Sequence, residues 1–196
     1  VFRDAVSAGV VAQVVPAVSR SGWNRVADIC NHFDRLYPCY GLHPYFVDRH
    51  GTADLDRLQT WLAQHEAVAV GECGLDYFMP EPDRERQKFF FDGQLAIAAD
   101  LHLPVVVHAN RAVEDVMLHI RRSRVRRGVI HSFNGSREQA LRLIDIGFKL
   151  GFGGAVTYDR AKRLRKLLSE LPADAILIET DAPDQPPSSH PHELNT

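Results

Sequence analysis

Cysteine is scarce in this sequence, and the few cysteines lie far apart. There are three, Cys30, Cys39 and Cys73, and no two of them form a C-x-x-C pair. An odd number of widely spaced cysteines argues against a disulfide framework and against a zinc knuckle. We therefore expect a protein of a reducing compartment, the cytoplasm.

The sequence also lacks a long apolar run and a strong excess of charge. No apolar stretch approaches the roughly 20 residues of a membrane span, so no segment is predicted to cross a membrane. The chain starts at Val1 and shows no leader of the signal-peptide type. A formal net charge of -2 argues against a protein that coats nucleic acid through bulk positive charge. An enzyme that acts on nucleic acid through a local basic rim is compatible with this charge.

The composition is that of an ordinary globular domain. The chain has 196 residues, of which 45% are hydrophobic and 24% charged, and this length allows one well-buried domain. No linker, repeat or low-complexity segment interrupts it, and no feature indicates an obligate protein partner. We expect residues 1–196 to form a single domain.

Short apolar runs alternate with longer segments of helical period, which is typical of parallel βαβ units. Seven strands are predicted, at Val10–Val18, Tyr37–Gly41, Ala67–Gly71, Val105–His108, Val129–His131, Lys149–Gly153 and Ile176–Thr180. Helices are predicted between them, at Gly22–Arg35, Leu55–Gln64, Arg84–Leu101, Ala112–Arg121, Arg137–Ile146 and Arg160–Leu171. The order fits either an open doubly wound sheet or a (β/α)₈ barrel.

Four of the predicted strands end in a side chain that can bind a metal ion. The segments AVAVGECGLD, PVVVHANR, GVIHSF and AILIETDAP place Glu72, His108, His131 and Asp181 at these ends. Imidazole and carboxylate together suit a divalent metal that activates water. Because four strand ends spread over more than half the chain converge only in a closed ring, the barrel is favoured. The sequence thus indicates a metallohydrolase.

Five sequence blocks resemble the TatD family of metal-dependent hydrolases. They read GLHP, GECGLDYF, LPVVVHANR, HSFNGS and ETDAP, in the order of the family. The resemblance implies an α/β fold of the TIM-type (β/α)₈ barrel kind and a magnesium-, manganese- or zinc-dependent phosphodiesterase, several members being DNases. It also implies that Glu72 bridges two divalent metal ions, which His108, His131 and Asp181 bind as well.

The chain departs from the family pattern in two places. The family has an H-x-H pair on its first strand, and no such pair occurs near Val1, so the first strand is expected to be missing from this chain. The C-terminal end is expected to be missing too, because a barrel needs an eighth strand and usually a closing helix. Many members have H-x-R after the fifth strand, where this chain has His108, Ala109 and Asn110. Arg111 is then the candidate for the guanidinium that binds substrate.

The remaining candidates each have two interpretations. His43 in GLHP contacts substrate phosphate or stabilises the turn before Pro44. Asp76 orients a histidine ligand or caps the following turn, and Glu179 either acts directly in the site or supports a ligand or the fold. Asp181 is also a candidate to accept a proton from the attacking water. Its alternative role is that of an N-cap or turn residue ahead of Pro183.

The expected function is phosphodiester hydrolysis with a metal-activated water, on DNA or another phosphodiester substrate. Glu72 and Asp181 would be catalytic, and Arg111 and His43 would bind substrate. Tyr77, Phe78 and Tyr158 are candidates to stack on bases, with packing as the alternative. Two other functions fit the same ligands: hydrolysis of an amide, cyclic amide or ester, and binding of a phosphorylated ligand without turnover.

Overall fold

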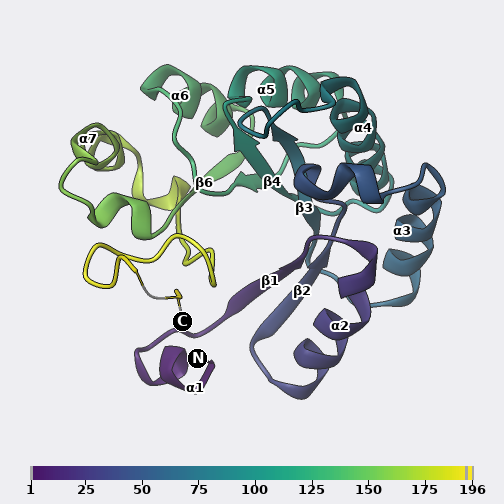
Figure 1. The fold of residues 1–196 in the computed structure, drawn as a ribbon, viewed down its shortest axis with the longest axis horizontal. Helices are drawn as coiled ribbons and strands as arrows, with labels where there is room; N and C mark the ends of the chain where they lie inside the picture. The colour runs from purple at the N-terminus through teal and green to yellow at the C-terminus, as the bar shows by residue number, and fades with distance from the viewer. Residues whose placement is uncertain (1, 193, 196) are drawn as a thin grey trace. The chain divides into compact units, whose positions relative to one another are not determined.

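The computed structural model describes residues 2–192 and 194–195, and the chain divides into two compact units, Val1–Val125 and Arg126–Thr196. Figure 1 shows strands and helices alternating along the chain. Seven strands are present in the described residues, and those within a unit pair in parallel.

The first unit contains four strands. They are β1 (Gln13–Ala17), β2 (Leu36–Tyr40), β3 (Ala69–Asp76) and β4 (Val105–Asn110). Its α-helices are α1 (Phe2–Ser7), α2 (Trp23–His32), α3 (Ala53–Gln64), α4 (Arg84–Asp100) and α5 (Val113–Arg122). Short 3-10 helices lie at Arg20–Gly22 and Pro44–Arg49.

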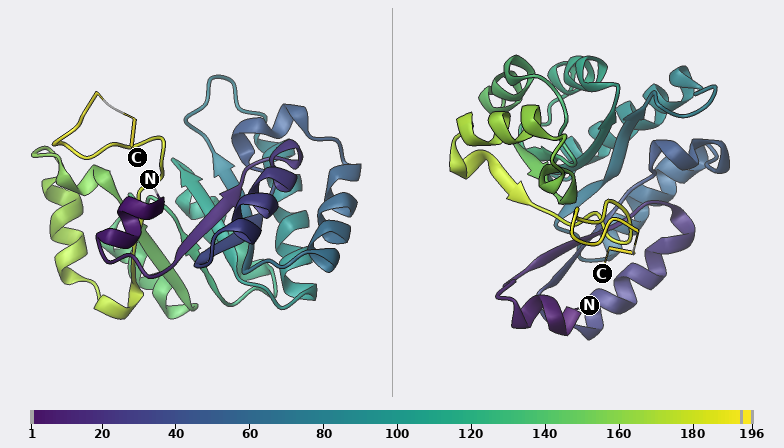
Figure 2. Two further views of the ribbon diagram at one scale, coloured as in Figure 1. Left: turned by 90° about the horizontal axis from the view of Figure 1, so that it is seen from below. Right: turned by 60° about the vertical axis from the view of Figure 1, so that its left-hand side comes forward.

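Each strand of the first unit pairs in parallel with the next, in chain order. Figures 1 and 2 show the helices α2 to α5 on one face of these strands. Leucine, isoleucine and phenylalanine side chains fill the layer between helices and strands, among them Leu75, Phe91 and Ile120. Because all four strands run the same way, their carboxyl ends lie at one edge.

Strand β3 is buried at all eight of its positions. Two of these positions carry carboxylates, Glu72 and Asp76, each only 5% exposed. A buried carboxylate is costly unless its charge is paired or hydrogen-bonded. Polar partners are therefore required in the interior of β3.

The second unit has the same alternation over fewer elements. Its strands are β5 (Gly128–Ile130), β6 (Phe148–Phe152) and β7 (Ile176–Ile178), paired in this order. Its helices are α6 (Arg137–Asp145) and α7 (Lys162–Glu170), with 3-10 turns at Gly154–Thr157 and Ala173–Ala175. A capping box between Ser136 and Gln139 starts α6, which satisfies two backbone N–H groups at its first turn.

The sequence predicts all seven strands and the six longer helices, with differences at their ends. The last predicted strand is too long, since β7 ends at Ile178 and not at Thr180. Two predicted strands are too short: β3 continues past Glu72 to Asp76, and β4 continues past His108 to Asn110. The reason is that these residues go on pairing, with Asp76 opposite Asn110. The short helix α1 is an element that the apolar pattern does not predict.

The state of the cysteines and the apolar character of the helices can be described directly. Cys30, Cys39 and Cys73 are all free thiols and are buried. Among the described residues, no helix combines the length and the apolar character that crossing a bilayer requires.

Candidate functional site

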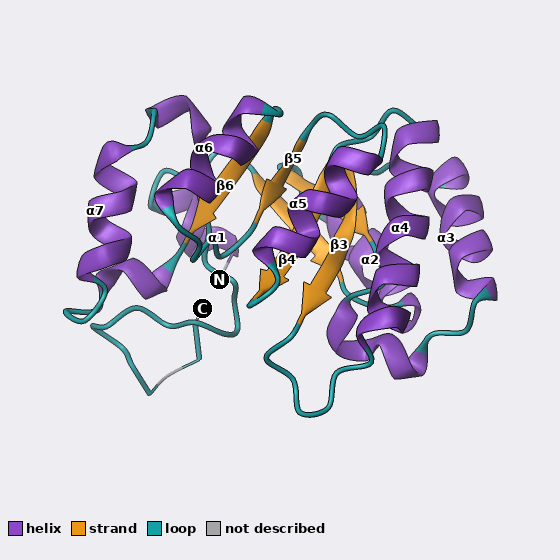
Figure 3. Cartoon of the chain, turned by 90° about the horizontal axis from the view of Figure 1, so that it is seen from above, coloured by secondary structure: helices purple, strands orange, loops and turns teal. Residues whose placement is uncertain are grey.

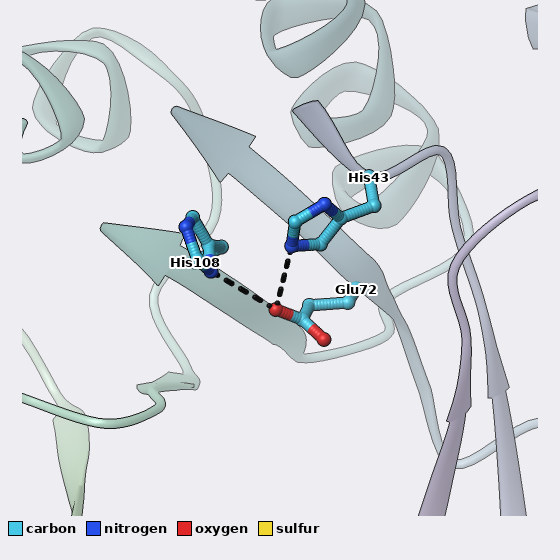
Figure 4. A group of neighbouring side chains, drawn as sticks. All are labelled: His43, Glu72 and His108. Atoms are coloured by element: carbon cyan, nitrogen blue, oxygen red, sulfur yellow. Dashed lines mark ion pairs between the residues drawn. The ribbon is translucent and has the colours of Figure 1, made fainter. Parts of the chain in front are cut away.

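Three side chains that lie in or directly after the consecutive strands β2, β3 and β4 converge toward the carboxyl ends of these strands. His43 follows β2, Glu72 lies in β3 and His108 lies in β4. One ligand atom of each lies within 4.8 Å of the others. Figure 4 shows both imidazoles directed at one oxygen of Glu72, with distances to Oε1 of 3.0 Å from His43 Nε2 and 3.3 Å from His108 Nδ1. We call this set the Glu72 group.

The imidazole of His108 lies between two carboxylates. Its Nε2 is 2.8 Å from Asp76 Oδ2, and its Nδ1 faces Glu72. Burial by itself lowers the pKa of His108, but the hydrogen bonds to Asp76 and Glu72 outweigh it and raise the pKa to about 9. A proton on Nδ1 thus occupies the position between the imidazole nitrogen and the Glu72 oxygen that a metal cation could take. These donors fit a divalent metal.

His43 presents a proton rather than a lone pair to Glu72. Its Nδ1 accepts a hydrogen bond from the backbone N–H of Tyr45 at 3.0 Å, so the neutral ring carries its proton on Nε2, the nitrogen directed at Glu72. The sequence leaves open whether His43 contacts substrate phosphate or stabilises the turn before Pro44. In the structure Nδ1 supports the turn and Nε2 faces Glu72.

Asp76 contacts both His108 and the turn that follows β3. Its Oδ2 contacts His108, and its Oδ1 accepts hydrogen bonds from the backbone N–H groups of Phe78 (2.8 Å) and Met79 (3.3 Å). Burial raises the pKa of Asp76, but these hydrogen bonds, together with the one from Asn110, outweigh it and lower the pKa. The carboxylate stays ionised and holds the His108 ring in one orientation.

Two glutamines of α4 hold the backbone on either side of the Glu72 group, and the sequence analysis missed them. Gln94 accepts a hydrogen bond from Leu42 N (2.7 Å) and donates one to Leu42 O (3.0 Å). Gln87 makes the same pair of bonds with the backbone of Asp76, at 2.8 and 3.0 Å. Their spacing of seven residues puts both on one helix face. Buried glutamines on an otherwise apolar face were the signal that could have found them.

Glycines allow the strands to approach each other at the Glu72 group. A Cβ on Gly41 would lie 2.5 Å from the carbonyl oxygen of Glu72. Gly74 has a φ of +131°, and a Cβ there would overlap the carbonyl oxygen of His108. Only glycine adopts this conformation without strain and leaves this space. The block GECG thus places Glu72 deep in a strand beside β4.

In the second unit, a histidine and two carboxylates form a looser group. His131 Nδ1 lies 3.9 Å from Glu179 Oε1 and 3.8 Å from Asp181 Oδ1. Glu179 accepts hydrogen bonds from Ser132 N (2.6 Å) and Ser132 Oγ (2.8 Å), and Asp181 accepts one from Gln185 at 2.5 Å. Burial raises the pKa of Glu179. We call this set the Glu179 group; Asp181 lies three residues beyond the end of β7.

The four predicted ligands thus fall into two pairs, Glu72 with His108 and His131 with Asp181, each within one unit. Arg111, the predicted substrate-binding residue, directly follows β4 and is exposed. Its guanidinium carbon lies 4.4 Å from the centre of the Phe78 ring.

The donor set and the parallel strands define a class of protein, a metal-dependent hydrolase with an α/β fold of the TIM-barrel kind. The family model described as TatD related DNase matches residues 1–196. The chain belongs to this family, as the five sequence blocks predict.

Individual relatives agree with the family. The uncharacterized metal-dependent hydrolase YjjV of Escherichia coli K12 is 40% identical over 188 residues, which are 94% of this chain and 73% of that protein. The crystal structure of E. coli YjjV, described as a TatD homologue, covers 98% of this chain with 76% of its own and 38% identity, and the TM-score is 0.95. This similarity confirms the predicted fold class. The 3'-5' ssDNA/RNA exonuclease TatD of Pantoea ananatis is 32% identical over 92% of this chain and 70% of its own.

Proposed function

We propose that this metal-dependent hydrolase cleaves phosphodiester bonds at the ends of nucleic acids, using two divalent ions, Mg²⁺, Mn²⁺ or Zn²⁺. The observation that carries the proposal is the Glu72 group, in which a buried carboxylate oxygen faces two imidazoles at 3.0 and 3.3 Å. Divalent ions held by such donors lower the pKa of water toward neutrality and stabilise charge that develops on a phosphoryl oxygen.

Glu72 and His108 are the proposed ligands in the first unit. Glu72 offers Oε1, and His108 offers Nδ1 once that nitrogen loses its proton. Asp76 accepts the hydrogen bond of the other ring nitrogen, which fixes the tautomer in which Nδ1 carries a lone pair. Asp76 thus holds the His108 ring in the orientation in which Nδ1 would bind the metal ion.

His43 is proposed to bind substrate. The backbone N–H of Tyr45 keeps the proton of the neutral His43 ring on Nε2, so the ring donates a hydrogen bond and accepts none there. In the structure Nε2 faces Glu72 Oε1 at 3.0 Å, and a non-bridging phosphate oxygen is an acceptor of the same kind as this carboxylate oxygen. Arg111 is proposed to hold a second oxygen of the phosphate.

In the second unit, His131 and Asp181 are the proposed ligands. Asp181 is also assigned the role of accepting a proton from the attacking water, since its carboxylate is one-third exposed and accepts a hydrogen bond from Gln185. Glu179, bonded to Ser132, is proposed to hold the loop that carries the ligand rather than to bind metal itself.

Two observations favour phosphorus over carbon as the atom attacked. Arg111 is an exposed cation directly after β4, and guanidinium groups suit anionic phosphate oxygens better than a neutral amide or ester. In addition, a relative that is 32% identical carries the name of a 3'-5' exonuclease on single-stranded DNA and RNA.

The test is nucleotide release from short single-stranded DNA with Mn²⁺ or Mg²⁺, against EDTA and against Asp181→Asn. The proposal predicts release that requires both the metal and Asp181. Protein that carries metal but releases no nucleotide, and that hydrolyses an ester or a cyclic amide instead, would contradict it. Arg111→Ala separates the two cases further, because it should weaken turnover of a charged diester far more than that of a neutral ester.

A further inference from the structure

The loop between β3 and α4 carries an exposed aromatic ring. Phe78 is 60% exposed, whereas the neighbouring Tyr77 is half-buried and donates a hydrogen bond from its hydroxyl to Asp115 at 2.7 Å. Figure 3 shows this loop extending beyond the carboxyl ends of β3 and β4. A single exposed ring is ordinary on a protein surface, so its surroundings decide what it means.

Arg111 lies against this ring and has an unusual backbone. Its guanidinium carbon is 4.4 Å from the ring centre of Phe78, within the range of a cation–π contact. Its φ is +53°, a left-handed conformation that non-glycine residues seldom adopt and that is frequent at binding sites. The backbone therefore turns at the residue that brings a cation onto the Phe78 ring.

The Phe78–Arg111 pair lies directly beside the Glu72 group in the chain and in the sheet. Asp76 and Asn110 are the last paired residues of β3 and β4, and Tyr77 N donates to Asn110 O at 2.9 Å. The pair follows immediately after these residues. Asp76 connects the two features, since Oδ1 accepts the backbone N–H of Phe78 and Oδ2 contacts His108, each at 2.8 Å.

We propose that Phe78 and Arg111 form a subsite for one nucleotide of a single-stranded nucleic acid, next to the bond that is cut. This inference rests on the proposed function. An unpaired base would stack on the exposed part of the Phe78 ring, because every base has a flat apolar face. The guanidinium carbon of Arg111 lies 4.4 Å from the ring centre, and the N–H groups of the guanidinium would bind the adjacent phosphate. The pair thus matches a ligand that is aromatic and anionic at neighbouring points.

The other stacking candidates lack the combination of an exposed ring and a cation. Tyr77 and Tyr158 lie under Arg84 and Arg160, at 4.3 and 4.9 Å from the ring centres, but both are less exposed than Phe78. The hydroxyl groups of Tyr77 and Tyr158 are bonded to Asp115 and to the carbonyl of Pro186, at 2.7 and 3.0 Å. Phe89 on α4 is 49% exposed, but its neighbour is the ring of Phe90 rather than a cation. Phe89 is therefore the matched control for removal of an exposed phenyl ring.

The experiment compares two substrates that differ only in bases. One is a short single-stranded oligonucleotide, and the other has the same phosphodiester backbone with abasic terminal nucleotides. Phe78→Ala is expected to lower kcat/KM for the first by about 10-fold, mainly through KM, and to leave the abasic substrate unchanged. Phe78→Trp should restore the preference for the substrate with bases over the abasic one. Phe89→Ala should change kcat/KM for neither substrate. Equal effects of Phe78→Ala on both substrates, or no effect on either, would overturn the proposal.

A binding measurement separates failure of the subsite from failure of the proposed function. The probe is an oligonucleotide with 2-aminopurine at its end, whose fluorescence falls when the base stacks. Quenching by the wild-type protein that is lost in Phe78→Ala supports the subsite even if no phosphodiester is cleaved. The absence of quenching by the wild-type protein overturns the subsite, whatever the hydrolysis assay shows.

Discussion

The Glu72 group and the Glu179 group contain the same kinds of side chains but are built differently. In the first, the carboxylate lies inside a fully buried strand, and imidazole nitrogens lie 3.0 and 3.3 Å from it. In the second, the carboxylates follow the last strand, are more exposed, and lie 3.8 to 3.9 Å from His131. A group held by strand backbone and by Asp76 is preorganised, whereas a group on a loop depends on the hydrogen bonds of that loop.

The largest expected difference between the groups is in catalysis. Glu72→Gln keeps the size of the side chain but removes the charge that faces both imidazoles, so kcat/KM for single-stranded DNA should fall by about 10³-fold or more. Glu179→Gln keeps acceptors for Ser132 and should cost about 10-fold. Steady-state kinetics at saturating Mn²⁺ measure both, with circular dichroism to verify folding. Equal losses in the two variants would show that the groups do not differ as described.

Glycine substitutions compare the rigidity of the two groups. Gly74→Ala places a methyl group against the backbone of His108 and forces a strained φ, so the free energy of unfolding should drop by about 3 kcal/mol. Gly151→Ala meets the carboxylate of Glu179, a side chain that can move, and should cost about 1 kcal/mol. Urea titrations give both values. Gly51→Ala is the control, because a methyl group there meets nothing within 4 Å.

Asp76 tests whether the orientation of His108 matters to metal binding. Asp76→Ala removes the acceptor of His108 Nε2, and we expect the Kd for Mn²⁺ to rise 10- to 100-fold. Asp76→Asn keeps an acceptor oxygen and should lose less. Calorimetric titration of the metal-free protein provides these constants. An unchanged Kd in Asp76→Ala would mean that the ring needs no such support.

The stability of the metal-free protein should depend on pH through His108. Its pKa is about 9 in the folded protein against 6.5 ordinarily, so its contribution is complete below about pH 6.5 and is lost as the pH rises toward 9. The loss is at most about 1.4 kcal/mol per pH unit. Added Mn²⁺ should stabilise more as the pH rises, since binding displaces the proton. Thermal unfolding in EDTA measures the pH dependence of the metal-free stability, and unfolding in Mn²⁺ measures the stabilisation by the metal. His108→Asn should flatten the pH dependence measured in EDTA.

The sequence predicts the positions of the strands well because apolar, β-branched runs between polar loops have few alternatives in a βαβ fold. It predicts the wrong end for β3 because the glycine and the carboxylate after Val70 resemble a loop. Only the pairing with β4 and the bonds from Gln87 allow Asp76 to remain in a strand. A local sequence pattern does not predict hydrogen bonds with residues from distant parts of the chain.

The sequence identifies candidate site residues by their type, but it does not predict which atoms they contact. Glu72 and His108 lie together as expected, and the sequence could not choose between the two roles of His43 or of Asp76. The structure shows why, since each of these side chains has two polar atoms that face different partners. Phe78 and Tyr77 also differ in exposure and in their neighbours, which the sequence does not display.

The most direct test of this account is Mn²⁺ binding to the metal-free protein, measured by calorimetry for wild type, Glu72→Gln and Glu179→Gln. We predict that Glu72→Gln weakens the tightest site at least 100-fold, and that Glu179→Gln changes it by less than about 10-fold. Tight binding that survives Glu72→Gln unchanged would contradict the assignment of the Glu72 group as the metal centre.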